Sequence, residues 1–387
     1  MFSSATAPAY LVIALLCALA WTKFLSRLTS PKPLNERFAT IDGLRGYLAL
    51  MVFVHHACIW YFVGQGGGWA QPPSNLYTHL GQSSVILFFM ITGFLFFHRI
   101  LSSGPSGPDW LQLLVSRVLR LTPLYWCAIA GMVLWIFVST GFTLYQSLWT
   151  FVKSVGHWML FTMTYAPALN GAKWPDQVLA GVVWSLHYEW FFYGCLPLAA
   201  LLAGRRPPAW ALGVSAIAAF YFWQWEPRGI HLFAFGCGMG SAMLIHRFGC
   251  KIQPSQRWPD LLVVVLLIAL VTFFADGTGY VQVAILGVVF WAIANGASLF
   301  GVLLLRVSRM LGDMAYGIYL LHGLLLFSAL GFRFSGTSLS PEAHWALVMA
   351  LIPPLVTLCW IAHRWVELPA MALVPTVVRR LRRRDTT

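Results

Sequence analysis

Long apolar segments recur along the whole chain and constrain its fold more than any other feature. A helix of about 20 mostly apolar residues is long enough to cross a bilayer. Charged residues make up only 10% of the chain, whereas soluble domains carry about 25%. The sequence therefore predicts an all-α integral membrane protein with about ten core transmembrane helices, over 46–63, 82–98, 121–140, 181–204, 209–224, 231–246, 260–275, 280–305, 311–331 and 345–362. The apolar run 8–22 predicts an extra N-terminal helix.

The formal net charge of +13 raises the question of a nucleic-acid partner. The basic residues lie in short clusters between apolar segments, as in the cytoplasmic loops of membrane proteins, so no nucleic-acid binding is predicted. If the loop before residue 46 is cytoplasmic, only Lys153, Lys173, Arg228 and Arg333 fall on the other side. The positive-inside tendency therefore predicts a cytoplasmic C-terminus, and the absence of basic residues before 8–22 predicts an N-terminus outside.

Three ionisable side chains share one face of the first core segment. In "RGYLALMVFVHH", His56 follows Arg45 by eleven residues, which is about three helical turns and about 16 Å along the axis. We therefore expect Arg45 at the cytoplasmic rim and His56 near the middle of the membrane. Asp42, three residues before Arg45, lies on the same face and can pair with it. His55 points about 100° away from His56.

Glu189 in "VVWSLHYEWFFY" and His322 in "YGIYLLHGLL" lie at similar predicted depths. The sequence thus predicts that one carboxylate and two imidazoles converge near the level of His56. Histidine suits a general base near neutral pH, and a carboxylate commonly orients it. Buried ionisable groups in membranes are usually functional, although each of these side chains could equally be a structural hydrogen-bonding group.

Arg117 and Arg120 are predicted to gather with Arg45 at the cytoplasmic mouth. Arginine clusters suit phosphate groups, although basic residues at this position also act simply as topology signals. The seven cysteines lie mostly in apolar segments and form no CxxC pair, so no disulfide or metal site is predicted.

Two classes of function remain open on these residues. One is an enzyme with a histidine base, and the other is a transporter or flippase that uses His56, Glu189 and His322 as a proton relay. Paired broken helices in inverted repeats would favour a transporter, and the sequence shows no such symmetry. A purely structural scaffold would leave the buried ionisable groups without a purpose.

Several stretches, in order along the chain, resemble acyltransferase family 3 membrane proteins. "IDGLRGYLALMVFVHH" resembles the family's opening span, with an arginine, ten residues and a histidine at Arg45 and His56. "LFFMITGFLFFHRI" is similar to the second span, with Thr92 where serine is usual. "LGDMAYGIYLLHGLLL" and "HRWVELPA" resemble the closing elements. Two further stretches match at Arg117, Arg120, Pro123 and Tyr125, and at Trp184, Ser185, Glu189, Phe192 and Tyr193.

The resemblance implies an O-acyltransferase of the bacterial inner membrane. The expected donor is cytoplasmic acyl-CoA, most often acetyl-CoA, with no permanently bound cofactor. The expected acceptor is a hydroxyl of an envelope glycan or lipid-linked glycan, such as O-antigen, capsule or exopolysaccharide. His187, Trp190 and Phe191 depart from the family pattern around Glu189 and put the acceptor in doubt.

The resemblance also implies roles for individual residues. His56 is expected to be the catalytic base, oriented by Glu189 or Asp42, while an acyl-histidine intermediate remains an alternative. The phosphates of acyl-CoA are expected at Arg45, Arg117 and Arg120. Supporting or substrate contacts are expected from His322, Trp184, Ser185 and Tyr125. The chain would then divide into an N-terminal extension (1–40), a membrane domain (41–370) and a basic cytoplasmic tail (371–387).

Overall fold

The structure is a computed structural model, and it describes residues 4–28, 38–163, 165–172, 174–225, 227–250, 252–253, 256–332 and 338–384. These residues form helices and connecting segments, without a β-strand among them. The helices are η1 (Ser4–Thr6), α1 (Pro8–Ser26), α2 (Ala39–Gly64), α3 (Asn75–Leu101), α4 (Trp110–Ser139), α5 (Leu148–Met159), α6 (Pro175–Val178), α7 (Val183–Leu202), α8 (Ala209–Trp223), α9 (Gly229–Phe248), α10 (Trp258–Phe273), α11 (Tyr280–Ala294), η3 (Val302–Leu304), α12 (Arg306–Asp313), α13 (Ala315–Leu326), η4 (Phe327–Phe332), α14 (Pro341–Ala362), η5 (His363–Glu367), α15 (Leu368–Ala372) and α16 (Val374–Arg384).

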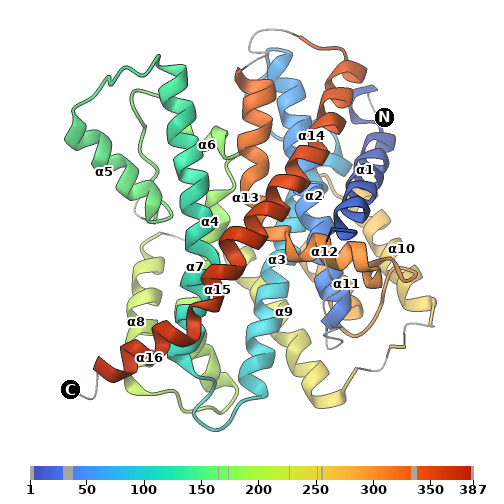
Figure 1. Cartoon of the computed structure of the whole chain (residues 1–387). Helices are drawn as coiled ribbons and strands as arrows, with labels where there is room; N and C mark the ends of the chain where they lie inside the picture. The colour runs from blue at the N-terminus through green and yellow to red at the C-terminus, as the bar shows by residue number, and fades with distance from the viewer. Residues whose placement is uncertain are drawn as a thin grey trace.

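Helices α2 and α3 form the centre of the bundle. Helix α2 packs against α3, α12 and α13, and α3 packs along α9 as well (Figure 1). Glycine allows these helices to approach closely. A Cβ at Gly238 of α9 would lie 2.1 Å from the carbonyl oxygen of Met90 in α3, and one at Gly312 would lie 1.7 Å from that of Asp42. Small residues at helix contacts are characteristic of membrane bundles, where close packing drives association.

Six helical segments of the described chain are long and apolar enough to cross a membrane. They are Ser4–Ser26, Ala39–Gly64, Asn75–Leu101, Trp110–Ser139, Gly229–Phe248 and Pro341–Arg383. A seventh arises if α12 and the segment Ala315–Gly331, which meet at a 66° bend, count as one span. Helices α8, α10 and α11 are apolar but have only 15, 16 and 15 residues. The predicted all-helical membrane class is therefore confirmed, whereas the count of ten core spans is not.

Helix α4 differs from its prediction. The sequence predicts an apolar span over 121–140 only. The helix instead begins at Trp110 and continues for 30 residues through Pro123. Asp109 caps this helix by accepting a hydrogen bond from the backbone of Gln112 at 3.1 Å. This continuity directs Arg117 and Arg120 into the bundle.

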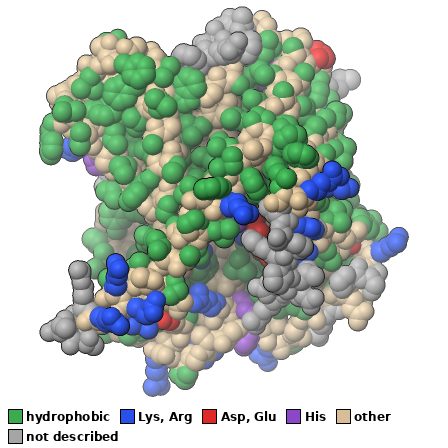
Figure 2. Space-filling view, viewed as in Figure 1, with side chains coloured by type: hydrophobic (Ala, Val, Ile, Leu, Met, Phe, Trp, Pro, Cys, Tyr) green, Lys and Arg blue, Asp and Glu red, His purple; other side chains and the backbone are tan. Residues whose placement is uncertain are grey.

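Basic side chains concentrate toward one end of one face of the molecule. On the face shown in Figure 2, most Lys and Arg side chains lie in the lower half, while the upper half is largely hydrophobic. The lower group includes the exposed residues Arg379, Arg380, Arg382 and Arg383 of α16. Residues 29–37 of the predicted N-terminal extension and 385–387 of the basic tail lie outside the described residues. The predicted division into three parts stays a prediction.

Candidate active site

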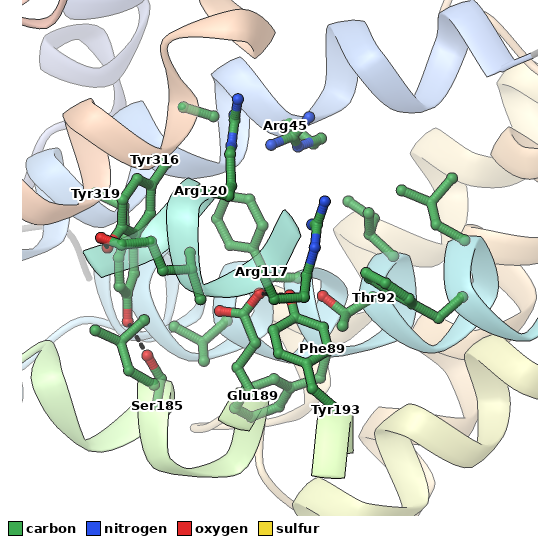
Figure 3. A pocket seen from close by; sticks show the side chains of 18 of the residues that line it. Arg45, Phe89, Thr92, Arg117, Arg120, Ser185, Glu189, Tyr193, Tyr316 and Tyr319 are labelled. Atoms are coloured by element: carbon green, nitrogen blue, oxygen red, sulfur yellow. Dashed lines mark hydrogen bonds between the residues drawn. The ribbon is translucent and has the colours of Figure 1, made fainter. Parts of the chain in front are cut away.

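A cavity of about 300 Å³ with polar and apolar walls opens among α2, α3, α4, α7 and α13. Its walls bring together residues that lie far apart in the sequence (Figure 3). Apolar side chains of α3, such as Phe88 and Phe89, form one wall. The polar side chains that line it are Arg45, Thr92, Arg117, Arg120, Ser185, Glu189, Tyr193, Asp313, Tyr316 and Tyr319.

Three arginines lie on one side of the cavity (Figure 3). The guanidinium carbon of Arg117 lies 5.0 Å from the ring centroid of Phe96 and 5.9 Å from that of Tyr193, so two aromatic faces hold it. Arg120 forms an ion pair of 3.4 Å with Glu367, whose side chain is fully buried. Planar guanidinium groups recognise phosphate oxygens through paired hydrogen bonds. The cavity therefore has the chemistry of a polyphosphate site.

Glu189 is a second carboxylate that interacts with this arginine group. It accepts a hydrogen bond from the hydroxyl of Tyr193, one helical turn further along α7. Arg117, Arg45 and Arg120 all interact electrostatically with it. Its charge offsets part of the positive charge of the three arginines, and this limits their mutual repulsion in a low-dielectric interior.

Ser185 and Tyr319 close the other side of the cavity with a 2.7 Å hydrogen bond between their hydroxyl groups (Figure 3). The nearby Tyr316 donates a 2.8 Å hydrogen bond to the carbonyl oxygen of Leu121, which ties α13 to α4. Tyr319 borders a second polar group as well, because its ring centroid lies 6.4 Å from that of His322. Tyr319 thus lies between the arginine-lined cavity and a pair of histidines.

His56 and His322 form that pair. Nδ1 of His56 lies 3.1 Å from Nε2 of His322 and 3.0 Å from the carbonyl oxygen of Val52. Nδ1 of His322 lies 2.9 Å from the carbonyl oxygen of Ile318. His322 is completely buried, whereas His56 is partly exposed.

These contacts determine the tautomers of the two neutral rings. A carbonyl oxygen can only accept a hydrogen bond, so both Nδ1 atoms carry the proton and donate. Nε2 of His322 is then an acceptor for the Nδ1–H of His56. The remaining Nε2 of His56 carries a lone pair, and no described residue hydrogen-bonds to it. His56 is therefore arranged as a base, with His322 orienting it through its other nitrogen.

The neighbouring His55 faces a different partner. Its Nδ1 donates a 2.7 Å hydrogen bond to the carbonyl oxygen of Tyr77 in α3. Its ring also packs so closely on Gly81 that a Cβ there would lie 2.5 Å from Cδ2 of His55. His55 therefore joins α2 to α3.

The remaining predicted residues lie in different places. Asp42 lies in the first turn of α2 and interacts electrostatically with Arg45. Ser185 lines the cavity, but Trp184 does not and instead lies 5.1 Å from His231 between ring centroids. Tyr125 donates a 2.7 Å hydrogen bond to the carbonyl oxygen of Trp158 and fastens α4 to the end of α5.

The structure thus brings the predicted groups together in two sets. Glu189 joins the arginines, and His322 joins His56. The hydrogen bonds of His56 go to Val52 and His322, not to Glu189 or Asp42. Tyr319 and Glu367 were not predicted. Tyr319 lies three residues before His322, and this spacing on one helix face was the available signal.

A helical bundle that joins an arginine-lined cavity to an oriented histidine base has the parts of a membrane-embedded transferase. The chain belongs to acyltransferase family 3, because the model of that family, described as an acyltransferase domain, matches residues 38–364. The chain is therefore an acyltransferase.

Two curated relatives are similar to the chain. Nodulation protein 10 of Rhizobium leguminosarum bv. viciae is 26% identical over 385 residues, which cover 90% of this chain and 98% of that protein. The exopolysaccharide production protein ExoZ of Rhizobium meliloti is 24% identical over 280 residues, which cover 63% of this chain and 76% of that protein. No solved structure matches the chain.

Proposed function

We propose that the protein is an O-acyltransferase that moves an acyl group, most simply acetyl, from acyl-CoA to a hydroxyl of an envelope glycan. The family supports acyl transfer. The names of the two relatives, one a nodulation protein and one an exopolysaccharide production protein, favour a glycan acceptor. The arginine-lined cavity favours a donor that carries several phosphate groups.

In this proposal the arginine end of the bundle faces the cytoplasm of a bacterial inner membrane. The phosphates of acyl-CoA bind Arg45, Arg117 and Arg120, and the pantetheine arm runs past Tyr319 toward His56. Arg45 and His56 lie on one face of α2, about 16 Å apart by helical rise. An extended donor can therefore be held at one end while its thioester reaches the base.

The reaction then needs one proton carrier. Nε2 of His56 takes the proton of the acceptor hydroxyl as the oxygen attacks the thioester carbonyl carbon. The resulting tetrahedral intermediate collapses when the carbon–sulfur bond breaks, and the imidazolium returns the proton to the departing thiolate. His322 steadies the cation, because its Nε2 lone pair accepts the hydrogen bond from Nδ1 of His56. General base catalysis of this kind commonly contributes about 10²–10⁴-fold.

The observation that carries the proposal is the position of α13. This one helix lines the arginine cavity with Tyr316 and Tyr319 and also supplies the histidine that orients His56. The test is to incubate the purified protein in lipid nanodiscs with acetyl-CoA labelled in its acetyl group. Oligosaccharide fragments of Rhizobium meliloti exopolysaccharide serve as acceptors, and mass spectrometry follows the label. Label in ester linkage on the glycan, lost in His56→Ala, is expected. No transfer to any glycan would overturn the proposal.

A further inference from the structure

Five aromatic side chains gather near the end of α2 opposite Arg45. Phe327 lies at their centre, with ring centroids 5.9 Å from Trp60, 6.2 Å from Trp135 and 5.3 Å from Trp174. Trp60 in turn lies 5.2 Å from Trp69. These five residues are called the aromatic cluster below. None of them lines the arginine cavity.

The aromatic cluster adjoins the catalytic base. The ring of Trp69 lies 6.2 Å from that of His56, with only 21° between the two planes. Trp60 follows His56 by four residues on α2, so the two share a helix face. The cluster and the arginine cavity therefore approach the histidine pair from different sides.

The local backbone is shaped around this cluster. Phe327 begins η4, a π-helical segment, and such segments occur frequently at functional sites. Within η4, a Cβ at Gly331 would lie 2.6 Å from Cη2 of Trp60. Only glycine therefore allows η4 to pack this closely on the Trp60 ring. Trp69 lies on the segment after α2 and is partly exposed.

One polar atom in the cluster lacks a partner. Trp60 is only 6% exposed, and its Nε1–H makes no hydrogen bond with any described residue. A buried indole N–H usually finds an acceptor, and leaving such a donor unpaired costs about 1–3 kcal/mol. An unpaired donor beside aromatic faces and a base points to a ligand that has both oxygen acceptors and an apolar face.

We propose that the aromatic cluster binds a sugar ring of the acceptor and holds one of its hydroxyls at His56. This inference rests on the proposed function. One face of a sugar ring consists of polarised C–H groups, which pack on the negative face of an indole ring. The hydroxyl oxygens of the same ring can accept from Nε1 of Trp60. A sugar packed on Trp69 lies beside His56, whose free Nε2 takes the hydroxyl proton.

The test measures the effect of a substitution on the KM for the glycan and on the KM for acetyl-CoA separately. Initial rates of Trp69→Ala and Trp69→Phe are measured in nanodiscs at varied concentrations of the exopolysaccharide fragments, and then at varied acetyl-CoA. Aromatic stacking contributes about 0.5–1.5 kcal/mol. We therefore expect Trp69→Ala to raise the KM for the glycan about 3- to 10-fold without changing that for acetyl-CoA. Trp69→Phe should retain most of the affinity for the glycan.

The control is Trp149→Ala, since Trp149 of α5 is 77% exposed and outside the cluster. This variant should match the wild type. Trp174→Ala repeats the test at a second position if Trp69→Ala does not reach normal membrane abundance. An unchanged glycan KM in folded, active Trp69→Ala and Trp174→Ala would overturn the aromatic cluster as the acceptor site while leaving the acyltransferase proposal intact. So would equal increases in both KM values. A wild type that transfers no label to glycan would instead overturn the proposed function.

Discussion

At the scale of single residues, hydrogen bonds to backbone carbonyls decide the chemistry of the two adjacent histidines. Nδ1 of His55 donates a hydrogen bond to the carbonyl oxygen of Tyr77 in α3, and the ring packs on Gly81. Nδ1 of His56 donates to the carbonyl oxygen of Val52 and to Nε2 of His322. No described residue hydrogen-bonds to Nε2 of His56. Both side chains are imidazoles in the same helical turn, yet only one is arranged as a base.

We expect His56→Ala to reduce acyl transfer by about 10²–10⁴-fold, because the proposed general base is removed. His55→Ala should retain a measurable rate, since it loses only the link to α3. Glycan acylation measured together with membrane abundance distinguishes these effects. An inactive but abundant His55→Ala beside an active His56→Ala would contradict the assignment of the base.

Arg120 is expected to act mainly on donor binding. Its guanidinium lines the cavity. In the proposed complex it attracts the donor phosphates in substrate and transition state alike, so its loss should weaken the binding of both equally. A hydrogen bond to a charged group contributes about 1.5–3 kcal/mol. Arg120→Ala should therefore raise the KM for acyl-CoA about tenfold or more, with a smaller change in kcat. Arg309→Ala, on α12 and outside the cavity lining, is the control. An unchanged KM for acyl-CoA in Arg120→Ala would show that Arg120 does not bind the donor and acts only as a topology signal.

At the scale of helices, irregular turns position groups that regular helical spacing would misplace. The π-helical segment η5 leads from α14 into α15 and brings Glu367 to Arg120. Glu367→Gln keeps the shape and removes the charge that holds Arg120. The Arg120 side chain then loses its fixed orientation, and the KM for acyl-CoA should rise, as in Arg120→Ala. In the double variant the two effects should not add, because both act through the same guanidinium. Additive effects would show that Glu367 acts elsewhere.

The contact of α3 with α9 depends on one of three glycines in "GCGMG". A Cβ at Gly238 would clash with the backbone of Met90, whereas Gly236 and Gly240 have nothing within 4 Å. Overpacking of this kind typically costs about 1–3 kcal/mol. Gly238→Ala should lower the thermal unfolding temperature in detergent, while Gly236→Ala should not. Equal behaviour of the two variants would contradict the close approach of α3 and α9.

The sequence predicted those parts of the site that follow from one regular helix. The register of Arg45 and His56 is of this kind, because α2 is unbroken from Ala39 to Gly64. Relations between helices were harder to predict. Glu189 was expected beside the histidines, but its place depends on how far α7 is offset from α2, which no single segment encodes. The ion pair of Glu367 depends on a π-helical turn that has no recognised pattern. The count of ten spans is not confirmed for a similar reason, since short apolar helices and full spans share one composition.

At the scale of the whole molecule, the proposed orientation places the arginine end in the cytoplasm. The basic residues of α16 lie on that side, in agreement with the positive-inside tendency. Green fluorescent protein fused after residue 387 should therefore fluoresce, since it folds in the cytoplasm. Alkaline phosphatase inserted at Gly68, where the backbone is exposed and nothing lies within 4 Å of an added Cβ, should be active because it requires the oxidising exterior. The reverse pattern of signals would invert the orientation and the proposed route of the donor.

The hydrogen bond between Ser185 and Tyr319 closes one side of the arginine cavity, and this matters for the proton gradient across the membrane. A water-filled passage from the arginine cavity to His56 and onward would let protons cross the bilayer and dissipate the gradient that drives ATP synthesis. Tyr319 lies between the two polar sites, so under the proposed mechanism this wall would open for the thioester arm of the donor and close behind it. The proposed enzyme would then move the acyl group across the membrane without letting protons leak through it, and the cell would keep CoA for further use.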